Sequence, residues 1–374
     1  MQKDGDPGRR PGKRLVSGKP DKAPKEKQPK KPSRLTRRQK LLIALAVVLA
    51  VTVTGVAAWQ SLFVRPDLTA EKEPLTTVDP DTGETEEVEE IDWGEGTRPR
   101  SDGERKSEDY YTVLILGRDT GGGGNTDTML LASYDVTNQK ATVMSIPRDT
   151  MVNVPWDIKK INSVYNYYGK GDRGIQYLYK EISQLVGFEP DYQVIVEWEA
   201  VGEIVDAMGG VWFDVPRNMD YEDPYQDLSI HISKGYQLLN GEQAMGVVRF
   251  RDGANGYKDG DIGRIGTQQA FLKAVAKQLL QIGNVKNIPA LVDIFYTYVK
   301  TDLTTGNLVW LGNEALNIGT ENIHFATLPG DGSGYYNKQS VYVLDAQATC
   351  DLVNEALNPY NEALTLEDMD ILVP

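Results

Sequence analysis

An uncharged run of 24 residues, Leu41 to Val64, limits what this chain can fold into more than any other feature. The run is apolar and long enough to cross the roughly 30 Å hydrocarbon core of a bilayer as a helix. Residues 1–40 carry 15 Lys and Arg against 4 Asp and Glu, a net charge of +11, while the whole 374-residue chain carries −14, so the rest carries −25. This charge asymmetry predicts a transmembrane helix over 41–64, with the N-terminus cytoplasmic and the remainder outside the membrane.

A cleaved signal peptide is the alternative interpretation of this run. Val56-Ala57-Ala58 resembles a small-residue cleavage site, and Arg37-Arg38 weakly resembles a twin-arginine signal. However, the apolar core of a signal peptide is usually only about 7–15 residues long. The length of the run therefore favours an uncleaved anchor.

Two segments beside the run have the composition of disordered chain. Residues 1–40 are rich in Lys, Pro and Gly, which predicts a disordered basic cytoplasmic tail held near anionic lipid. Residues 65–109 include the acidic stretch DPDTGETEEVEE, which predicts a flexible linker. We expect one extracytoplasmic domain over 110–374.

Alternating apolar runs and amphipathic segments within residues 110–374 predict an α/β domain. YTVLILG is typical of a buried strand, and DTMLLASYDVTNQKATVMSI predicts two strands around a turn. Helical spacing over 173–186, and a capping box formed by Asn240 and Gln243, predict two helices. The expected fold is an α/β/α sandwich with a central mixed sheet.

Composition and motifs exclude several kinds of site. A single cysteine, Cys350, excludes a disulfide framework and a cysteine zinc site, and its predicted helix indicates a buried small side chain. His231 and His324 are the only histidines. The sequence contains no P-loop, GxSxG or SxxK motif. The acidic net charge argues against nucleic-acid binding.

A few arginines stand out in the acidic exterior part. Arg148 follows a predicted strand. If the RFR segment is extended, Arg249 and Arg251 share one face while Phe250 points into the core. Arg264 and Gln268, four residues apart, share a helical face. Arginines gathered from separate segments suit phosphate or pyrophosphate recognition, although surface ion pairs explain any single one of them.

Two aspartates flank a glycine-rich loop. Asp119 precedes Gly121–Gly124 and Asp127 follows it. Carboxylates beside phosphate-binding arginines suit a hard divalent cation, magnesium (Mg²⁺, or Mn²⁺). Such Asp-Thr pairs more commonly serve as turn formers or caps, and that alternative stays open. From the residues alone, we expect an extracytoplasmic α/β domain that handles phosphate groups.

Six sequence blocks resemble the LytR-CpsA-Psr family of bacterial cell-envelope proteins. They occur in the family's order over about residues 110–285: LGRDTGGGGNTDTMLL, SIPRDT, KINSVYNYYG, VDAMGGVWFDVP, LNGEQAMGVVRFR and GDIGRIGTQQAFL. The resemblance implies an α/β/α sandwich with an apolar lipid pocket. It also implies a phosphotransferase that moves an anionic glycopolymer from a polyprenyl-pyrophosphate carrier onto peptidoglycan, forming a phosphodiester.

The resemblance also implies roles for particular residues. Metal-binding aspartates fall at Asp119 and Asp127. The family's catalytic arginines correspond to Arg148, Arg249, Arg251 and Arg264, and its substrate-binding lysine and glutamine to Lys160 and Gln268.

Two positions depart from the family pattern. Asn125 stands where many members have arginine, and it retains a donor for a phosphate oxygen. Thr267 replaces an arginine that often precedes the glutamine. With these cations missing, a non-catalytic envelope-binding or regulatory protein remains an alternative. A pyrophosphatase or phosphodiesterase that uses water as acceptor also remains open, because motifs do not encode the choice of acceptor.

Overall fold

The computed structural model describes residues 63–69, 76–78, 85–87, 97–118, 126–224, 228–250, 260–279 and 288–372. Within these ranges no helix has the length and apolar character needed to cross a bilayer. The predicted span, residues 41–64, lies outside the described ranges except for its last two residues, and the predicted basic tail over 1–40 lies outside them completely.

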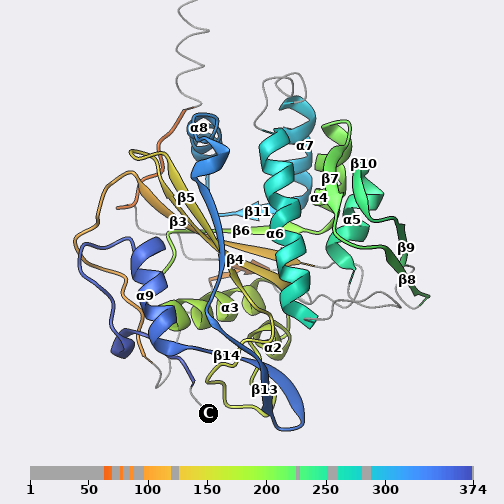
Figure 1. The fold of residues 1–374 in the computed structure, drawn as a ribbon. Helices are drawn as coiled ribbons and strands as arrows, with labels where there is room; N and C mark the ends of the chain where they lie inside the picture. Colours follow the sequence, from red (N-terminus) through yellow and green to blue (C-terminus); the bar gives the residue numbers. More distant parts are fainter. Residues whose placement is uncertain are drawn as a thin grey trace, which may run out of the picture. The chain divides into compact units, whose positions relative to one another are not determined.

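A six-stranded mixed sheet forms the centre of the described domain, as the sequence predicts (Figure 1). In the order β11-β6-β3-β4-β5-β12, β3 pairs with β6 and β5 with β12 in parallel, and the other neighbours are antiparallel. The strands are β3 (Tyr110–Arg118), β4 (Thr126–Asp135), β5 (Lys140–Ile146), β6 (Tyr192–Glu197), β11 (Val299–Thr301) and β12 (Ile323–Thr327).

Three helices bury the first face of the sheet in an apolar core. Because side chains alternate along a strand, every second residue of β3, β4 and β5 points to this face. Leu114, Leu116, Met129, Leu131 and Met144 are almost fully buried there. The covering helices are α2 (Ile161–Tyr167), α3 (Gly171–Val186) and α9 (Ala346–Ala356), of which α3 agrees with the helix predicted over 173–186.

The second face of the sheet is apolar but less completely covered. Several of the alternate side chains of β3, β4, β5 and β6 are only half-buried, although Tyr111, Leu130 and Ser145 on this face are buried. The half-buried side chains include Val113, Ile115, Ala132, Val143 and Val194. Helix α6 (Gly260–Leu279) contacts this face, because Gln269 Nε2 lies 2.8 Å from Ser145 Oγ and 3.1 Å from Thr327 Oγ1. Two further helices are α7 (Ile288–Tyr298) and α8 (Thr305–Ala315).

A second apolar core lies beside the central sheet, among helices and two antiparallel ribbons (Figure 1). Phe213 and Phe271 meet edge to face there, with ring centroids 5.4 Å apart. The capping box of Asn240 and Gln243, predicted from the sequence, begins α5. The elements are α4 (Glu199–Ala207), α5 (Gly241–Arg249), and the pairs β7 (Val211–Val215) with β10 (Gly235–Leu239) and β8 (Met219–Asp223) with β9 (Leu228–Ile232).

Both described ends of the segment predicted as a linker, 65–109, contact the folded domain. Arg65 pairs with Asp109 at 3.0 Å and donates from Nε to Tyr111 Oη at 3.1 Å. Arg105 binds the Asp191 carboxylate at 2.8 Å. Between these ends, β1 (Thr76–Val78) pairs with β2 (Thr85–Glu87). The described ends of this acidic segment are therefore held by charged contacts.

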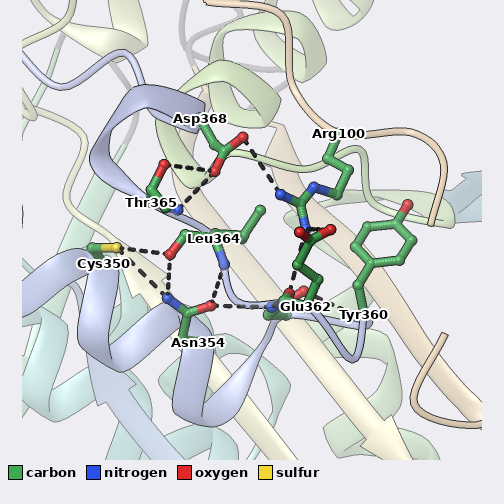
Figure 2. A network of polar contacts seen from close by, with 9 residues as sticks. Arg100, Cys350, Asn354, Tyr360, Glu362, Leu364, Thr365 and Asp368 are labelled. Carbon is green, nitrogen blue, oxygen red and sulfur yellow. Dashed lines mark hydrogen bonds and ion pairs between the residues drawn. The ribbon is translucent and has the colours of Figure 1, made fainter. Parts of the chain in front are cut away.

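C-terminal residues of the chain contact Arg100, which belongs to the segment that precedes β3 (Figure 2). The Arg100 guanidinium lies 3.5 Å from Glu362 and 3.6 Å from Asp368, and within 6.0 Å of the Tyr360 ring. Cys350 is buried, as predicted, with Sγ 3.5 Å from the Leu364 carbonyl. The remaining elements are β13 (Gly330–Tyr336), β14 (Gln339–Leu344) and the short helices η2 (Thr320–Asn322) and η3 (Leu366–Asp368).

A carboxyl group on α3 should make stability depend on pH. Burial, followed by the charge of Asp370, raises the pKa of Glu181 from 4.5 to about 7. The folded state therefore binds the proton of the Glu181 carboxyl group more tightly than the unfolded state does. This difference stabilises the folded state fully below pH 4.5, and the stabilisation is lost as the pH rises to about 7. We expect Glu181→Gln to remove this part of the pH dependence. Urea unfolding at pH 4.5, 6 and 8 measures it, and identical pH profiles for the two proteins would contradict the prediction.

Candidate active site

Strand ends meet at one edge of the central sheet. Arg118 and Glu197, the last residues of β3 and β6, are direct partners in the parallel register. In the antiparallel pair of β4 and β5, Met129 is opposite Ile146, so the start of β4 lies beside the end of β5. Ligands of open α/β sheets bind beyond the carboxyl ends of the strands. Asp127 is the second residue of β4, and Arg148 follows the end of β5 by two residues. Asp119, the next residue after Arg118 in the sequence, lies outside the described residues.

The SIPRDT and KIN blocks are in direct contact. Lys160 Nζ lies 3.0 Å from Asp149 Oδ1, and both side chains are largely buried. The backbone N–H groups of Ile161 and Asn162 donate to the carbonyls of Thr150 and Arg148. The structure thus brings two predicted site residues, Arg148 and Lys160, together at the start of α2.

Arg249 lies at the end of a helix, so the extended RFR segment considered from the sequence is wrong for this residue. Helix α5 continues to Arg249, and Phe250, which follows it, adopts extended backbone angles. Phe250 is fully buried, as expected. Arg251 lies outside the described residues.

Helix α6 connects the two arginine segments. Gln268 Nε2 donates to the Val248 carbonyl at 3.0 Å, one residue before Arg249. The next residue, Gln269, reaches Ser145, three residues before Arg148. Arg264, one turn earlier on α6, is 4% exposed. This single helix therefore positions α5 and the end of β5 with respect to one another.

The proposed metal ligands lie mostly outside the described part of the chain. Asp119, Asn125 and the side chain of Asp127 are not described, and the described residues hold no group of three His, Cys, Asp or Glu able to bind a metal. At the same edge, the hydroxyls of Thr126 and Thr128 are buried without a hydrogen-bond partner among the described residues. Oxygen donors of this kind fit a hard divalent cation, so Mg²⁺ stays a prediction.

Comparison with known proteins decides the family. The model of the LytR_cpsA_psr family matches residues 76–358, about three quarters of the chain. The chain belongs to the LytR-CpsA-Psr family. The resemblance seen in its six sequence blocks is thereby confirmed.

The relatives of this LytR-CpsA-Psr protein come from several bacteria. It is 27% identical to the regulatory protein MsrR of Staphylococcus aureus, over 60% of this chain and 66% of MsrR. It is 26% identical to the polyisoprenyl-teichoic acid–peptidoglycan teichoic acid transferase TagV of Bacillus subtilis, over 64% of this chain and 61% of TagV. The chain thus spans just under two thirds of the length of these relatives.

Solved structures of the family share the fold. The crystal structure of B. subtilis TagV matches 65% of this chain and 94% of its own, with a TM-score of 0.53 and 23% identity. A LytR-Csp2A-Psr enzyme from Actinomyces oris matches 70% of this chain and 96% of its own, with a TM-score of 0.54 and 20% identity. These likenesses confirm a mixed α/β fold with a central mixed sheet.

One ion pair in this family member was missed by sequence reasoning. Arg118 Nη2 lies 2.6 Å from Glu197 Oε1, and both side chains are mostly buried at the edge where Asp119 follows. Burial is the largest single influence and lowers the pKa of Arg118. The hydrogen bond that Arg118 donates to Glu197, together with the charges of Tyr165 and Glu197, raises this pKa by more, so the net pKa is raised. A charged residue at the end of the apolar YTVLILG run was the signal that could have revealed this position.

The departure at Thr267 has a structural explanation. Its side chain is buried, and its hydroxyl donates to the Gly263 carbonyl of the same helix at 3.1 Å. Thr267 therefore satisfies its own polar group within α6 and supplies no cation to the site. Arg264 is the neighbouring cation that α6 retains.

Proposed function

We propose that this protein is a membrane-anchored phosphotransferase that moves an anionic glycopolymer from a polyprenyl-pyrophosphate carrier onto peptidoglycan. The observation that carries the proposal is the way α6 links the predicted site segments. Gln268 of α6 contacts Val248, the residue before Arg249, and Gln269 contacts Ser145 of the strand that leads to Arg148. Lys160 is held beside Asp149. The name of TagV describes the same class of donor and acceptor for that relative.

The second face of the sheet supports a lipid-linked donor. Val113, Ile115, Ala132, Val143 and Val194 are half-buried, whereas their neighbours on the first face are almost completely buried. Burial of apolar surface stabilises a complex by about 25 cal/mol per Å² removed from water. A polyprenyl chain lying along this face would complete its burial and leave the pyrophosphate near the strand ends.

The residues at the edge suit phosphoryl transfer by positioning and charge. Arg148, Arg249 and Arg264 hold non-bridging oxygens of the pyrophosphate. A sugar hydroxyl of peptidoglycan attacks the glycan-side phosphorus and passes its proton to a carboxylate of the site. The bond from this phosphorus to the bridging oxygen breaks, and polyprenyl phosphate leaves. The arginines stabilise the charge that develops on the leaving group. Mg²⁺ bound by Asp119 and Asp127 would supply further neutralisation of that charge.

The membrane anchor is part of the same proposal. The uncharged run over 41–64 ends at Val64, whose backbone N–H donates to the Gly306 carbonyl at 3.2 Å and whose carbonyl accepts from Asn307 Nδ2 at 2.9 Å. These contacts support an anchor that enters the domain at the start of α8. The domain would then lie at the outer surface of the membrane, where a lipid-linked donor is available.

The lipid retained by the protein tests the donor assignment. We expect mass spectrometry of extracts from the detergent-purified full chain to detect polyprenyl phosphates or glycosylated polyprenyl pyrophosphates, enriched over the parent membrane. The enrichment is expected because the half-buried apolar face and the arginines recognise the two ends of one molecule. Phospholipids in the proportions of the parent membrane, with no polyprenyl species, would contradict the proposal.

A further inference from the structure

Four aromatic side chains form a cluster at the surface beside the predicted site. Trp156 stacks on Tyr167 with ring centroids 3.8 Å apart, and Tyr168 stacks on Tyr177 at 3.5 Å. The two pairs meet edge to face, since Trp156 and Tyr168 lie 5.8 Å apart at 78°. Tyr167 is 58% exposed, and the other three rings are half-buried against the first core. We call these four residues the aromatic cluster.

The aromatic cluster is held rigidly before any ligand binds. Trp156 Nε1 donates to Ser163 Oγ at 2.8 Å, and Ser163 Oγ donates in turn to the Lys160 carbonyl at 2.6 Å. The backbone N–H of Tyr168 donates to the Val164 carbonyl and closes the end of α2. A surface ordered in this way loses little conformational entropy when it binds.

The loop that carries Trp156 has its base at the predicted active site. Met151 pairs with Lys160 in an antiparallel bridge, and Val152 N–H donates to the Lys159 carbonyl, so Trp156 lies near the tip of the loop that they close. At the base, Lys160 contacts Asp149, the residue after Arg148. Four residues of extended chain reach at most about 13–14 Å. A chain molecule that reacts at the base of the loop can therefore continue onto the aromatic cluster.

The chemistry of the aromatic cluster suits sugar rings. The faces of aromatic rings are electron-rich and attract the weakly positive C–H groups on the flat side of a pyranose. Arg173 and Lys180 lie 5.9 Å from the centre of the Tyr177 ring and provide donors for sugar oxygens. Exposed aromatic groups with a polar rim mark binding surfaces.

The acceptor is the substrate that needs this surface. The proposed donor already has a lipid chain for the apolar sheet face and a pyrophosphate for the arginines. The acceptor strand has neither group, so its repeating sugar rings, with their N-acetyl and peptide substituents, are what the protein must recognise. Given the proposed function, we infer that the aromatic cluster binds the glycan strand of peptidoglycan and delivers its hydroxyl to the site.

The acceptor dependence of transfer tests this inference. The full chain is assayed with a lipid-pyrophosphate donor and soluble, uncross-linked peptidoglycan strands. We expect Tyr167→Ala to raise the KM for the strands about three- to tenfold, because one stacking surface is lost. The KM for the donor and kcat should stay unchanged, and Tyr167→Phe should behave as the wild type. Tyr236→Ala, which removes another exposed aromatic ring on β10, is the matched control.

Other values of the acceptor KM, the donor KM or the binding to peptidoglycan would contradict either the inference or the proposed function. An unchanged acceptor KM contradicts the inference, and a raised donor KM would assign the aromatic cluster to the donor glycan instead. Sedimentation with purified insoluble peptidoglycan provides a readout that does not need catalysis. If Tyr167→Ala weakens this binding but the wild type transfers nothing, the proposed function and the delivery of the hydroxyl fail, and the assignment of the aromatic cluster as a peptidoglycan-binding surface stands. If transfer occurs and both binding and KM are unaffected, only the inference fails.

Discussion

Replacing Arg249 by alanine should lower the rate of glycopolymer transfer about 10²- to 10³-fold. Arg249 ends α5, directly after the carbonyl that Gln268 holds from α6. If its guanidinium stabilises the leaving polyprenyl phosphate, its removal costs about 2.7–4 kcal/mol in the transition state. A double variant, Arg249→Ala with Arg251→Ala, should lose at least as much.

The measurement is single-turnover transfer of labelled glycan with saturating donor. Lys234→Ala is the matched control, because it removes a cation from an exposed turn of the same domain. The variants should keep the wild-type urea midpoint within error, so that a lost rate reports chemistry. Unchanged transfer by the double variant would refute the assignment of these arginines.

Replacing Asp191 by alanine should remove about 3–5 kcal/mol of the free energy of unfolding, the cost of breaking a largely buried ion pair from one side. The Asp191 carboxylate, 10% exposed, accepts from both terminal nitrogens of Arg105 at 2.8 and 2.9 Å. It also accepts from the backbone N–H and the hydroxyl of Thr112 at 2.8 and 2.7 Å. The alanine variant leaves these buried donors without their acceptor.

Equilibrium urea unfolding of both proteins at pH 7 measures this loss. Asp331→Ala is the control, because the exposed carboxylate of Asp331 in β13 accepts hydrogen bonds from Ser333, two residues further along the same strand. That variant should stay within about 0.5 kcal/mol of the wild type. A loss below 1 kcal/mol for Asp191→Ala would show that Arg105 and Thr112 find other partners.

Local signals in the sequence predicted much of the fold. The apolar run before Arg118, the paired strands around the turn at 136–139 and the capping box of Asn240 all depend on neighbouring residues. The β8–β9 ribbon was not predicted, because each strand is only five residues long, although MDYED and LSIHI both alternate apolar and polar residues. The segment 65–109 was predicted as a flexible linker from its acidic composition, which does not reveal the contacts of Arg65 and Arg105.

The candidate site was predicted less completely, because its contacts join distant segments. The sequence blocks named Arg148, Lys160 and Arg249, but not the side chains that position them. Arg118 and Glu197 are 79 residues apart, and Gln269 and Ser145 are 124 apart. Such pairs depend on strand order and on the placement of α6, which local patterns do not encode.

The product of the reaction tests the central claim most directly. The full chain is incubated with labelled polyprenyl-pyrophosphate-linked glycan, Mg²⁺ and peptidoglycan, and the wall material is then digested and analysed by mass spectrometry. The account predicts labelled glycan joined to a peptidoglycan sugar through a phosphodiester, with polyprenyl phosphate released in equal amount. Free glycan phosphate without any peptidoglycan-bound label would show hydrolysis and contradict the assignment as a transferase.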